Sequence, residues 1–360
     1  MEAGVQASEL RRRGLQAEIP AYRITQPGQA REDTNVNFRP GSLFAEFCSL
    51  LFSKNQQSPS RMTGPIAWMN GALIPYAQAA LPVWDLGVVA GASVTEMART
   101  FAHKPFRLSQ HLHRLLIAIQ KIGFRIQYSE PQLLDAVTAV LAHNVPLIPA
   151  SRELGIVIFS TAGGNATYLG AERAAGMQPS TVVHTFELPF ETWRPQLRHG
   201  VRLRVSSVRQ IPGECFDVSL KVRNRLHWWL ADHEAAQHEP GSKALLLDHA
   251  GFVAETSTSA VHLVCKDRII TPDRGVLNSL SSQLVEQFAG TLGIPFDRRP
   301  VLLAECDDAS EVFLTSSAST LLPVSHIDGK KIGMNVRGPV FQKLADCWSE
   351  RVGIDIHQQL

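Results

Sequence analysis

Lys221 is the residue whose position along the chain most directly suggests covalent chemistry. It follows a strand-like segment, VRLRVSSVR, and precedes a helical run that Asp217 or Ser219 could cap. The expected inner face of that run is Leu226, Trp229, Leu230 and His233. A lysine held at such a junction can lose hydration, which lowers its pKa and makes the amine a nucleophile toward carbonyl carbons. The alternative is a solvated lysine, the usual state beside a helix, so the assignment depends on the other motifs.

Composition excludes several classes of protein. The chain has 360 residues, 44% of them hydrophobic and 19% charged, which is ordinary for a globular protein of one large or two medium domains. Its net charge of +2 gives no reason to expect nucleic acid or a membrane surface as partner, and no apolar run is long enough to span a bilayer. Five cysteines without a CxxC pair favour a reducing compartment, the cytoplasm, and argue against a zinc site. Neither a Walker loop nor a GxGxxG turn occurs, and the histidines lack metal-ligand spacing.

The chain divides into four segments. Residues 1–63 are polar and turn-rich, and we expect a mostly disordered extension with a short amphipathic element at Leu43–Phe52. Residues 64–188 are expected to form a smaller α/β domain, and residues 189–199, with two prolines, a linker. Residues 200–360 would form a larger domain that carries Lys221. Interleaved strands and helices with several hairpins predict a two-domain α+β or mixed α/β architecture.

The smaller domain begins with a strong hairpin signal, because Asn70-Gly71 lies between the apolar runs IAWM and ALIP. A second hairpin is expected to run from Val94–Phe101 to Phe106–Leu108. Ser109 is the expected cap of a helix that ends at Gly123. Arg114 lies off the apolar stripe of this helix, and periodicity alone favours a solvated arginine there. The remaining predicted elements are a helix at Pro131–His143 and strands at Gly155–Ser160 and Thr181–Leu188.

The larger domain is expected to alternate strands with three helices. The helices are the run after Lys221, the segment Ser279–Leu292 and the segment Pro339–Val352. The predicted strands are Val201–Val208, Ala244–Leu247, Phe252–Thr256, Val261–Cys265, Arg268–Thr271 and Val312–Thr315.

Six blocks in register resemble the fold type IV family of pyridoxal-phosphate enzymes, which includes branched-chain aminotransferases, D-amino-acid aminotransferases and aminodeoxychorismate lyases. The similarity covers about residues 66–335. Its blocks are MNGALIP with WDLGVVAGASVTEMAR, PFRLSQHLHRL, SLKVRNRL, GFVAETSTSA, ITPDRGVLNSLS and VFLTSSASTLLPV. The resemblance implies a pyridoxal-phosphate-dependent aminotransferase that acts on an amino acid and a keto acid by a ping-pong Schiff-base mechanism.

The resemblance also implies roles for individual residues. Lys221 falls where the family places the Schiff-base lysine, which holds the cofactor and then moves the substrate's Cα proton. Glu255 falls where the family places the acid that faces the pyridine nitrogen, although by itself it fits a surface carboxylate of a hairpin. Arg114 matches the phosphate-binding arginine. The other expected phosphate contacts are Ser281, Ser316 and Ser317, and the expected substrate contacts are Thr95 and Arg225.

Three single positions depart from the family's pattern, and in addition the family's Gly-Ile-Thr-Arg block reads Ser279-Leu280-Ser281-Ser282 here. Ala260 stands where the family has an asparagine, and Leu226 where an aromatic residue often bonds the cofactor's phenolic oxygen. Ala162 replaces an arginine that commonly helps to hold a substrate carboxylate. Cofactor binding is therefore better supported than any particular substrate.

Two alternatives stay open at this stage. Asn224-Arg225-Leu226 after Lys221 is close to the pattern of aminodeoxychorismate lyases, and the three departures are compatible with a non-catalytic binding or scaffold protein. The family resemblance further implies a homodimer in which a partner loop completes each active site, with small molecules as the other partners.

Overall fold

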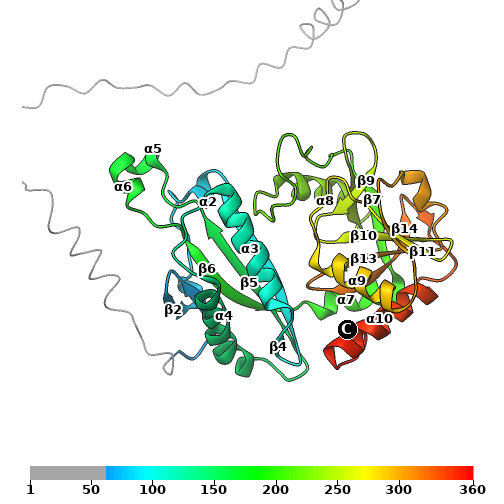
Figure 1. Ribbon diagram of the computed structural model, residues 1–360, viewed down its shortest axis with the longest axis horizontal. Coiled ribbons are helices and arrows are strands. Elements are labelled where there is room, and N and C mark those ends of the chain that lie inside the picture. The colour runs from blue at the N-terminus through cyan, green and yellow to red at the C-terminus, as the bar shows by residue number, and fades with distance from the viewer. Residues whose placement is uncertain (1–61, 360) are drawn as a thin grey trace, which may run out of the picture. The chain divides into compact units, whose positions relative to one another are not determined.

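The computed structural model describes residues 62–359. The expected amphipathic element at Leu43–Phe52, and all but the end of the expected N-terminal extension, lie outside the described residues. Two β-sheets organise the described part of the chain (Figure 1). One has six strands in the order β2-β1-β6-β5-β3-β4, and the other has nine, in the order β12-β11-β10-β13-β14-β7-β8-β9 with β15 beside β14.

The six-stranded sheet is built from neighbouring antiparallel pairs. Its strands are β1 (Ile66–Met69), β2 (Ala72–Pro75), β3 (Ser93–Phe101), β4 (Lys104–Pro105), β5 (Leu154–Thr161) and β6 (Thr181–Glu187). The β1–β2 hairpin is confirmed, and both turn residues have positive φ, 51° at Asn70 and 93° at Gly71. The second hairpin closes earlier than predicted, because the buried Glu153 carboxylate accepts hydrogen bonds from the turn amides of Ala102 and His103.

Helices α3 (Leu108–Ile122) and α4 (Glu130–Asn144) pack on this sheet (Figure 1). Helix α3 ends at Gly123, whose φ of 77° suits a residue without a side chain. The sequence predicted Ser109 as the cap of α3, and this prediction is wrong. The cap residue is Arg107, in the left-handed region, because the short β4 strand ends two residues before it and the helix starts earlier. The short helices of this half are α2 (Leu86–Val89), α5 (Ala166–Leu169) and α6 (Ala171–Ala175).

The predicted linker is a helix, α7 (Phe190–His199). Phe190, Trp193 and Leu197 lie at helical spacing and are buried in the same core as the nine-stranded sheet. Pro195 lies within α7, although the two prolines of this segment predicted a linker. The segment still connects the two sheets along the chain, but as a packed helix.

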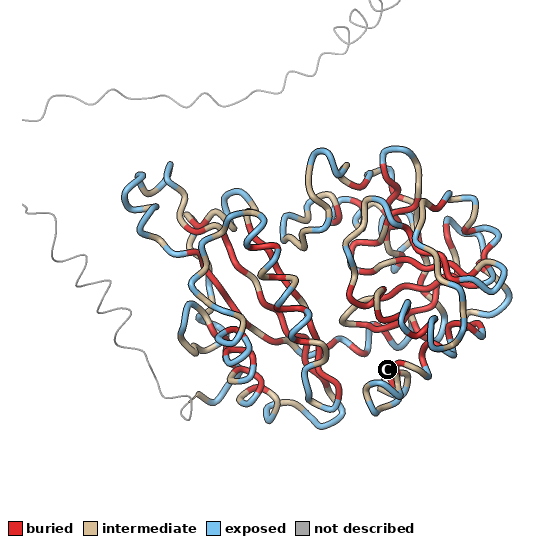
Figure 2. The backbone as a smooth tube through the Cα atoms, viewed as in Figure 1, coloured by how far each residue is buried: buried red, intermediate tan, exposed pale blue. Residues whose placement is uncertain are grey.

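The nine-stranded sheet is mixed, because β7 pairs in parallel with β8 and β14, and β11 pairs in parallel with β12. Its strands are β7 (Val201–Val205), β8 (Lys243–Leu247), β9 (Val253–Thr256), β10 (Ala260–Cys265), β11 (Arg268–Thr271), β12 (Phe296–Arg298), β13 (Glu311–Ser316), β14 (Thr320–Ile327) and β15 (Lys330–Lys331). Strand β14 was not predicted. The buried residues follow the strands of both sheets (Figure 2).

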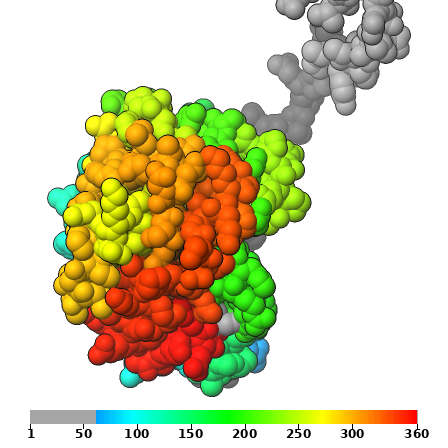
Figure 3. All heavy atoms as spheres, turned by 90° about the vertical axis from the view of Figure 1, so that its right-hand side faces the viewer, coloured from blue at the N-terminus to red at the C-terminus, as the bar shows by residue number. Residues whose placement is uncertain are grey.

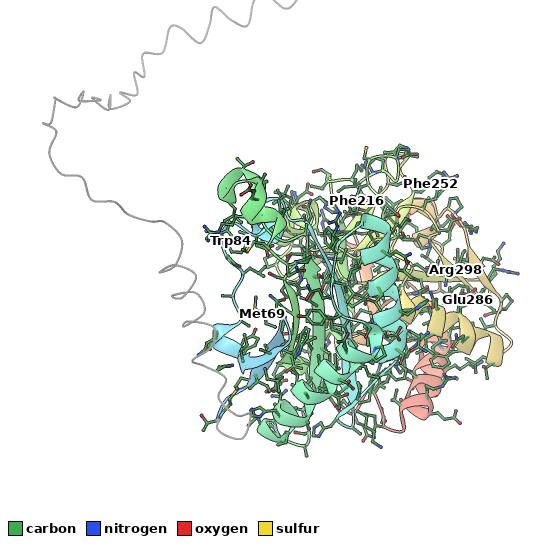
Figure 4. The ribbon with its side chains drawn as sticks, turned by 60° about the vertical axis from the view of Figure 1, so that its left-hand side comes forward. Met69, Trp84, Phe216, Phe252, Glu286 and Arg298 are labelled. Atoms are coloured by element: carbon green, nitrogen blue, oxygen red, sulfur yellow. The ribbon has the colours of Figure 1, made fainter. Side chains whose placement is uncertain are left out.

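Three longer helices accompany this sheet: α8 (Leu226–His238), α9 (Leu280–Thr291) and α10 (Pro339–Val352). On α9, Glu286 forms an ion pair of 2.7 Å with Arg298 of β12 (Figure 4). Figure 3 shows the C-terminal residues, in red, beside the later strands of the sheet, in orange. Trp348 and Phe341 of α10 are buried there in the core.

The prediction for α8 was wrong in its start and in its buried face. The helix begins five residues after Lys221, and Asp217 bonds Ser219 instead of capping it. Its inner residues are Trp228, Ala231 and Ala235, which pack against Ala244 and Leu246 of β8. The buried face thus combines Trp228 with two small alanines, and the other large apolar side chains lie on the outer face. Leu226, Trp229 and Leu230 are consequently 65%, 59% and 45% exposed.

Candidate active site

A cavity of about 830 Å³ brings together seven of the eight sequence-predicted site residues. Its walls come from β3 and α3 of the first half and from the segments around Lys221, Glu255 and Ser316 of the second. The seven residues are Thr95, Arg114, Lys221, Arg225, Glu255, Ser316 and Ser317. The eighth, Ser281, lies behind this wall and lines a smaller cavity that shares Leu280 and Ser317 with the large one.

Lys221 is placed by backbone pairing with β3. Its carbonyl accepts a hydrogen bond of 2.8 Å from the N–H of Thr95, and Val222 forms a β-bridge with Val94. Burial lowers the pKa of Lys221 to about 8, with Arg114 and Arg225 acting in the same direction and the two nearby glutamates opposing them. Much of the amine is therefore uncharged in mildly alkaline solution, as nucleophilic chemistry requires. Phe216 lies shortly before Lys221 in the chain. In Figure 4 it is near the end of α3, and there Lys121 pairs with Asp217.

Glu255 lies on β9, and two donors hold one of its carboxyl oxygens. Its Oε1 accepts hydrogen bonds from Gln210 Nε2 at 3.2 Å and from the N–H of Leu277 at 3.3 Å. Gln210 Nε2 also donates to the carbonyl of Gly275 at 2.7 Å, which fixes the amide. Burial raises the pKa of Glu255 to about 7. A hydrogen-bonded, buried carboxyl group of this kind strongly favours a cationic partner in the cavity.

Arg114 is not a solvated arginine: its side chain is 17% exposed and forms a two-point ion pair with Glu96. Arg114 Nε and Nη2 lie 2.5 and 2.9 Å from the two Glu96 oxygens, and Nη1 donates to the carbonyl of Asn278 at 2.6 Å. Burial raises the pKa of Glu96, but hydrogen bonds from His111 and Arg114 outweigh it and bring the pKa to about 2. Three of the five N–H donors of Arg114 are thus occupied, and one on each Nη remains for an anion.

His111 completes this cluster from one turn earlier on α3. Its Nδ1 lies 2.7 Å from Glu96 Oε2. Burial lowers the pKa of His111, so the neutral ring donates from Nδ1 to the carboxylate. Sequence reasoning missed Glu96, His111 and Gln210 as site residues. The spacing of His111 and Arg114 on one helix face was the available signal, because residues three apart on a helix are neighbours.

Two backbone segments near Arg114 are suited to an anion. The first turn of α9 has N–H groups without an acceptor in the helix, and its cap is Ser279, whose Oγ accepts from Ser282 N at 3.2 Å. Ser282 Oγ is buried and has no hydrogen-bond partner among residues 62–359. The second segment is the turn after β13, in which Ser316 Oγ accepts from Ser319 N at 3.0 Å. Hydroxyl and amide donors beside an arginine fit a phosphate group.

Thr95 and Arg225 also reach the cavity, with part of their hydrogen-bonding capacity already used. Thr95 Oγ1 donates to the carbonyl of Ile158 at 3.1 Å. Arg225 Nη2 donates to the carbonyl of Ser257, and its guanidinium lies 5.8 Å from the ring centre of Trp228. Arg223 lines the same cavity and stacks 4.4 Å over Phe159.

The three departures from the family's pattern occupy different places. Ala260 lines the cavity, whereas Ala162 is not among the lining residues and donates its N–H to the carbonyl of Ala92. Leu226 is turned outward on α8. Neither Leu226 nor Ala162 therefore offers a contact to a molecule in the cavity.

A cavity that combines a buried lysine, a buried carboxyl group and a helix N-terminus defines the site of a pyridoxal-phosphate-dependent enzyme. The family model "Amino-transferase class IV" matches residues 93–327. The chain belongs to this family, and its predicted class, a pyridoxal-phosphate-dependent aminotransferase, is confirmed. The comparisons support that prediction over the lyase and the non-catalytic alternatives.

Curated relatives with this family's names cover most of the described chain. A putative branched-chain-amino-acid aminotransferase of Methanocaldococcus jannaschii is 26% identical over 81% of this chain and 99% of its own length. A D-alanine aminotransferase of Bacillus licheniformis is 25% identical over 75% of this chain and 91% of its own length. A branched-chain-amino-acid aminotransferase-like protein of Arabidopsis thaliana is 27% identical over 79% of this chain, but the match spans 50% of that protein.

Solved structures give the same fold. A branched-chain amino acid aminotransferase of T.th., complexed with N-(5'-phosphopyridoxyl)-L-glutamate, is 28% identical, with a TM-score of 0.71 over 81% of this chain and 95% of that one. The enzyme of Thermoproteus uzoniensis with norvaline is 25% identical, with a TM-score of 0.71 over 80% and 94%. In the part of the chain that the structure describes, no helix combines the length and apolar character needed to cross a membrane.

Proposed function

We propose that the chain transfers the amino group of an amino acid to a keto acid, with pyridoxal 5'-phosphate held in the 830 Å³ cavity. The observation that carries the proposal is the pairing of Lys221 and Glu255 in one cavity, with pKa values of about 8 and about 7. Burial lowers the pKa of Lys221 and raises the pKa of Glu255, so both values lie near neutral pH, as sites of acid–base chemistry require. Residues 64–188 and 200–360 act in this proposal as two domains that share the cofactor.

The residues present fit the cofactor at both of its ends. Arg114, the first turn of α9 with Ser281, and the turn with Ser316 and Ser317 would hold the phosphate, and Glu255 would face the ring nitrogen. When bound, pyridoxal phosphate supplies an aldehyde that accepts the amino group and a ring that withdraws electrons from the reacting carbon.

Lys221 would carry out the proton transfers. Its Nζ, with a pKa of about 8, can take the proton from the substrate's Cα and return one later in the cycle. Glu255 would stay ionised opposite a protonated ring nitrogen, since a cationic partner lowers the pKa of a buried carboxyl group. Gln210 and the N–H of Leu277 keep its Oε1 oriented.

Substrate choice is expected to differ from that of simple amino-acid aminotransferases. Ala162 provides no guanidinium, so Arg225, Arg223 and Thr95 are the proposed contacts for a substrate carboxylate. Losing one charge-assisted contact costs about 1.5–3 kcal/mol, or one to two powers of ten in affinity. We therefore expect weak half-reactions with leucine, glutamate or D-alanine as donors. A bulkier substrate with its carboxylate placed elsewhere would avoid this loss.

A donor panel tests both the reaction and this specificity. Purified protein loaded with cofactor is mixed with each donor, and loss of the visible absorbance of the lysine-attached cofactor is followed. Fast, tight half-reactions with ordinary α-amino acids would contradict the Ala162 argument. Release of pyruvate from aminodeoxychorismate, with the visible absorbance of the cofactor retained, would favour the lyase chemistry suggested by Asn224-Arg225-Leu226. A protein without any cofactor absorbance would overturn the proposed function.

We also propose a homodimer that uses the outer face of α8. Leu226, Trp229 and Leu230 occur at i, i+3 and i+4 and are 65%, 59% and 45% exposed, beside the cavity segment. Burying such side chains is worth about 1.5–3 kcal/mol each. Trp229→Glu should therefore shift the sedimentation coefficient from dimer to monomer, whereas Met334→Glu, at a position 88% exposed, should not. Wild-type protein that sediments as a monomer at every concentration, yet binds cofactor, would contradict this proposal.

The proposed location is the cytoplasm. Four cysteines lie in the described part of the chain, and all are free thiols. Burial raises the pKa of Cys306 to about 12, which keeps that thiol protonated and unreactive.

A further inference from the structure

Arg107 links α3 to the start of α9, across the two halves of the chain. It is the cap residue of α3, with φ of 52° in the left-handed region, where a residue with a side chain is unusual. Its Nη1 donates a hydrogen bond of 2.6 Å to the carbonyl of Leu280, the first residue of α9. Strained backbone of this kind persists where surrounding contacts hold it, and such positions gather at functional sites.

The charge of Arg107 is not neutralised by a neighbouring acid. Between residues 62 and 359, no carboxylate lies within ion-pair distance of its guanidinium. Burial lowers the pKa of Arg107, and the positive charges of Arg351 and Arg114 lower it further. The charges of Arg351 and Arg114 therefore add to the positive potential at Arg107, which an anion would relieve.

Arg107 lies directly behind the proposed phosphate contacts. The small cavity that it lines is also lined by Ser281 of α9 and by Ser317 of the turn after β13. Leu280, whose carbonyl it holds, lines both this cavity and the large one. A guanidinium on that carbonyl fixes the orientation of the first turn of α9, whose free N–H groups point away from the helix body.

We propose that Arg107 is a positioning residue for the cofactor's phosphate: it holds the Leu280 carbonyl so that the first turn of α9 presents its N–H groups to the phosphate. This inference rests on the proposed function, because it assumes that the phosphate lies at this helix end. Arg107 does not touch the cofactor itself. Its contribution is orientation together with one uncompensated positive charge.

Pyridoxal 5'-phosphate and pyridoxal separate this role from a general structural one. Both have the same ring and the same aldehyde for Lys221, but pyridoxal lacks the phosphate. The dissociation constants of both are measured by absorbance titration of the cofactor-free full chain. The variants are Arg107→Ala, Arg107→Gly and Arg107→Lys, with Arg125→Ala as the control at an exposed position three residues after the end of α3. Arg107→Gly removes the same side chain while relaxing the left-handed backbone, which protects folding.

We expect Arg107→Ala and Arg107→Gly to weaken binding of the phosphorylated cofactor about tenfold or more, with pyridoxal binding unchanged. Arg107→Lys should recover part of the loss, and Arg125→Ala should bind like the wild type. Equal weakening of both compounds, or no weakening of either, would overturn the inference while leaving the proposed function intact. Wild-type protein that binds neither compound would overturn the proposed function, and this inference with it.

Discussion

Lys221→Ala is expected to abolish transamination, with a loss of at least about a thousandfold, because it removes the attachment point and the proton-transferring base together. The variant should still bind the cofactor through Arg114 and the two backbone segments. Borohydride reduction of the wild type should fix the cofactor covalently on Lys221, as peptide mapping by mass spectrometry would show. The variant should release all of its cofactor after the same treatment.

Lys243→Ala is the matched control, because Lys243 is the other lysine that lines the cavity and burial also lowers its pKa. It should keep both the covalent adduct and most of the activity. A reduced adduct mapped to Lys243, or to any lysine but Lys221, would refute the assignment.

The rate of cofactor attachment should also depend on pH in a defined way. The uncharged amine reacts, so the rate should rise with pH up to about 8, the pKa of Lys221, and then level off. A solvated lysine, with its pKa near 10.4, would give a rate that continues to rise above that point.

Arg114→Ala is expected to cause the largest loss of stability among the site variants. It leaves the Glu96 carboxylate, which is 1% exposed, without its arginine partner and with only the hydrogen bond from His111. Removing one partner of a buried pair costs about 3–5 kcal/mol, so urea unfolding at pH 7 should show a free energy of unfolding lower by that amount. The loss of unfolding free energy should be smaller near pH 4, because Glu96 of the variant can then accept a proton. Cofactor binding should weaken as well, since the two Nη N–H donors proposed for the phosphate disappear with the guanidinium.

A double variant separates the two roles of Arg114. Arg114→Met with Glu96→Gln removes both charges and should recover much of the free energy of unfolding, but not the affinity for the phosphate. Arg125→Ala again serves as the exposed control and should change neither quantity. An Arg114→Ala variant with wild-type stability and wild-type cofactor affinity would mean that this arginine is solvated after all.

Local sequence patterns determined most of the secondary structure. The turns at Asn70-Gly71 and Lys266-Asp267, the stop at Gly123 and the helix at Pro339–Val352 all depend on residues within a few positions of one another. The same patterns missed β14, because Pro323 cannot donate to a sheet and reads as a strand breaker. That strand lies between β13 and β7, with an irregularity between Val324 and His326 on the β7 side.

The motif blocks likewise identified Lys221, Glu255 and Arg114, because each belongs to a short run of characteristic residues. Which face of α8 is buried, and whether Pro189–His199 is a linker or a packed helix, depended on partners far along the chain. Periodicity specifies that a helix has an apolar face, but packing against Ala244 and Leu246 of β8 decided which face that is.

Only the tertiary structure decided what surrounds the site residues. Arg114 meets Glu96 at a separation of 18 positions and Asn278 at 164, and Arg107 meets Leu280 at 173. Gln210 reaches Glu255 across 45 positions. No local pattern encodes such contacts, because each is formed where two elements that are far apart in the chain pack together. The chemical identity of the site therefore belongs to the sequence, while its pKa values, its charge balance and the support behind its phosphate contacts belong to the fold.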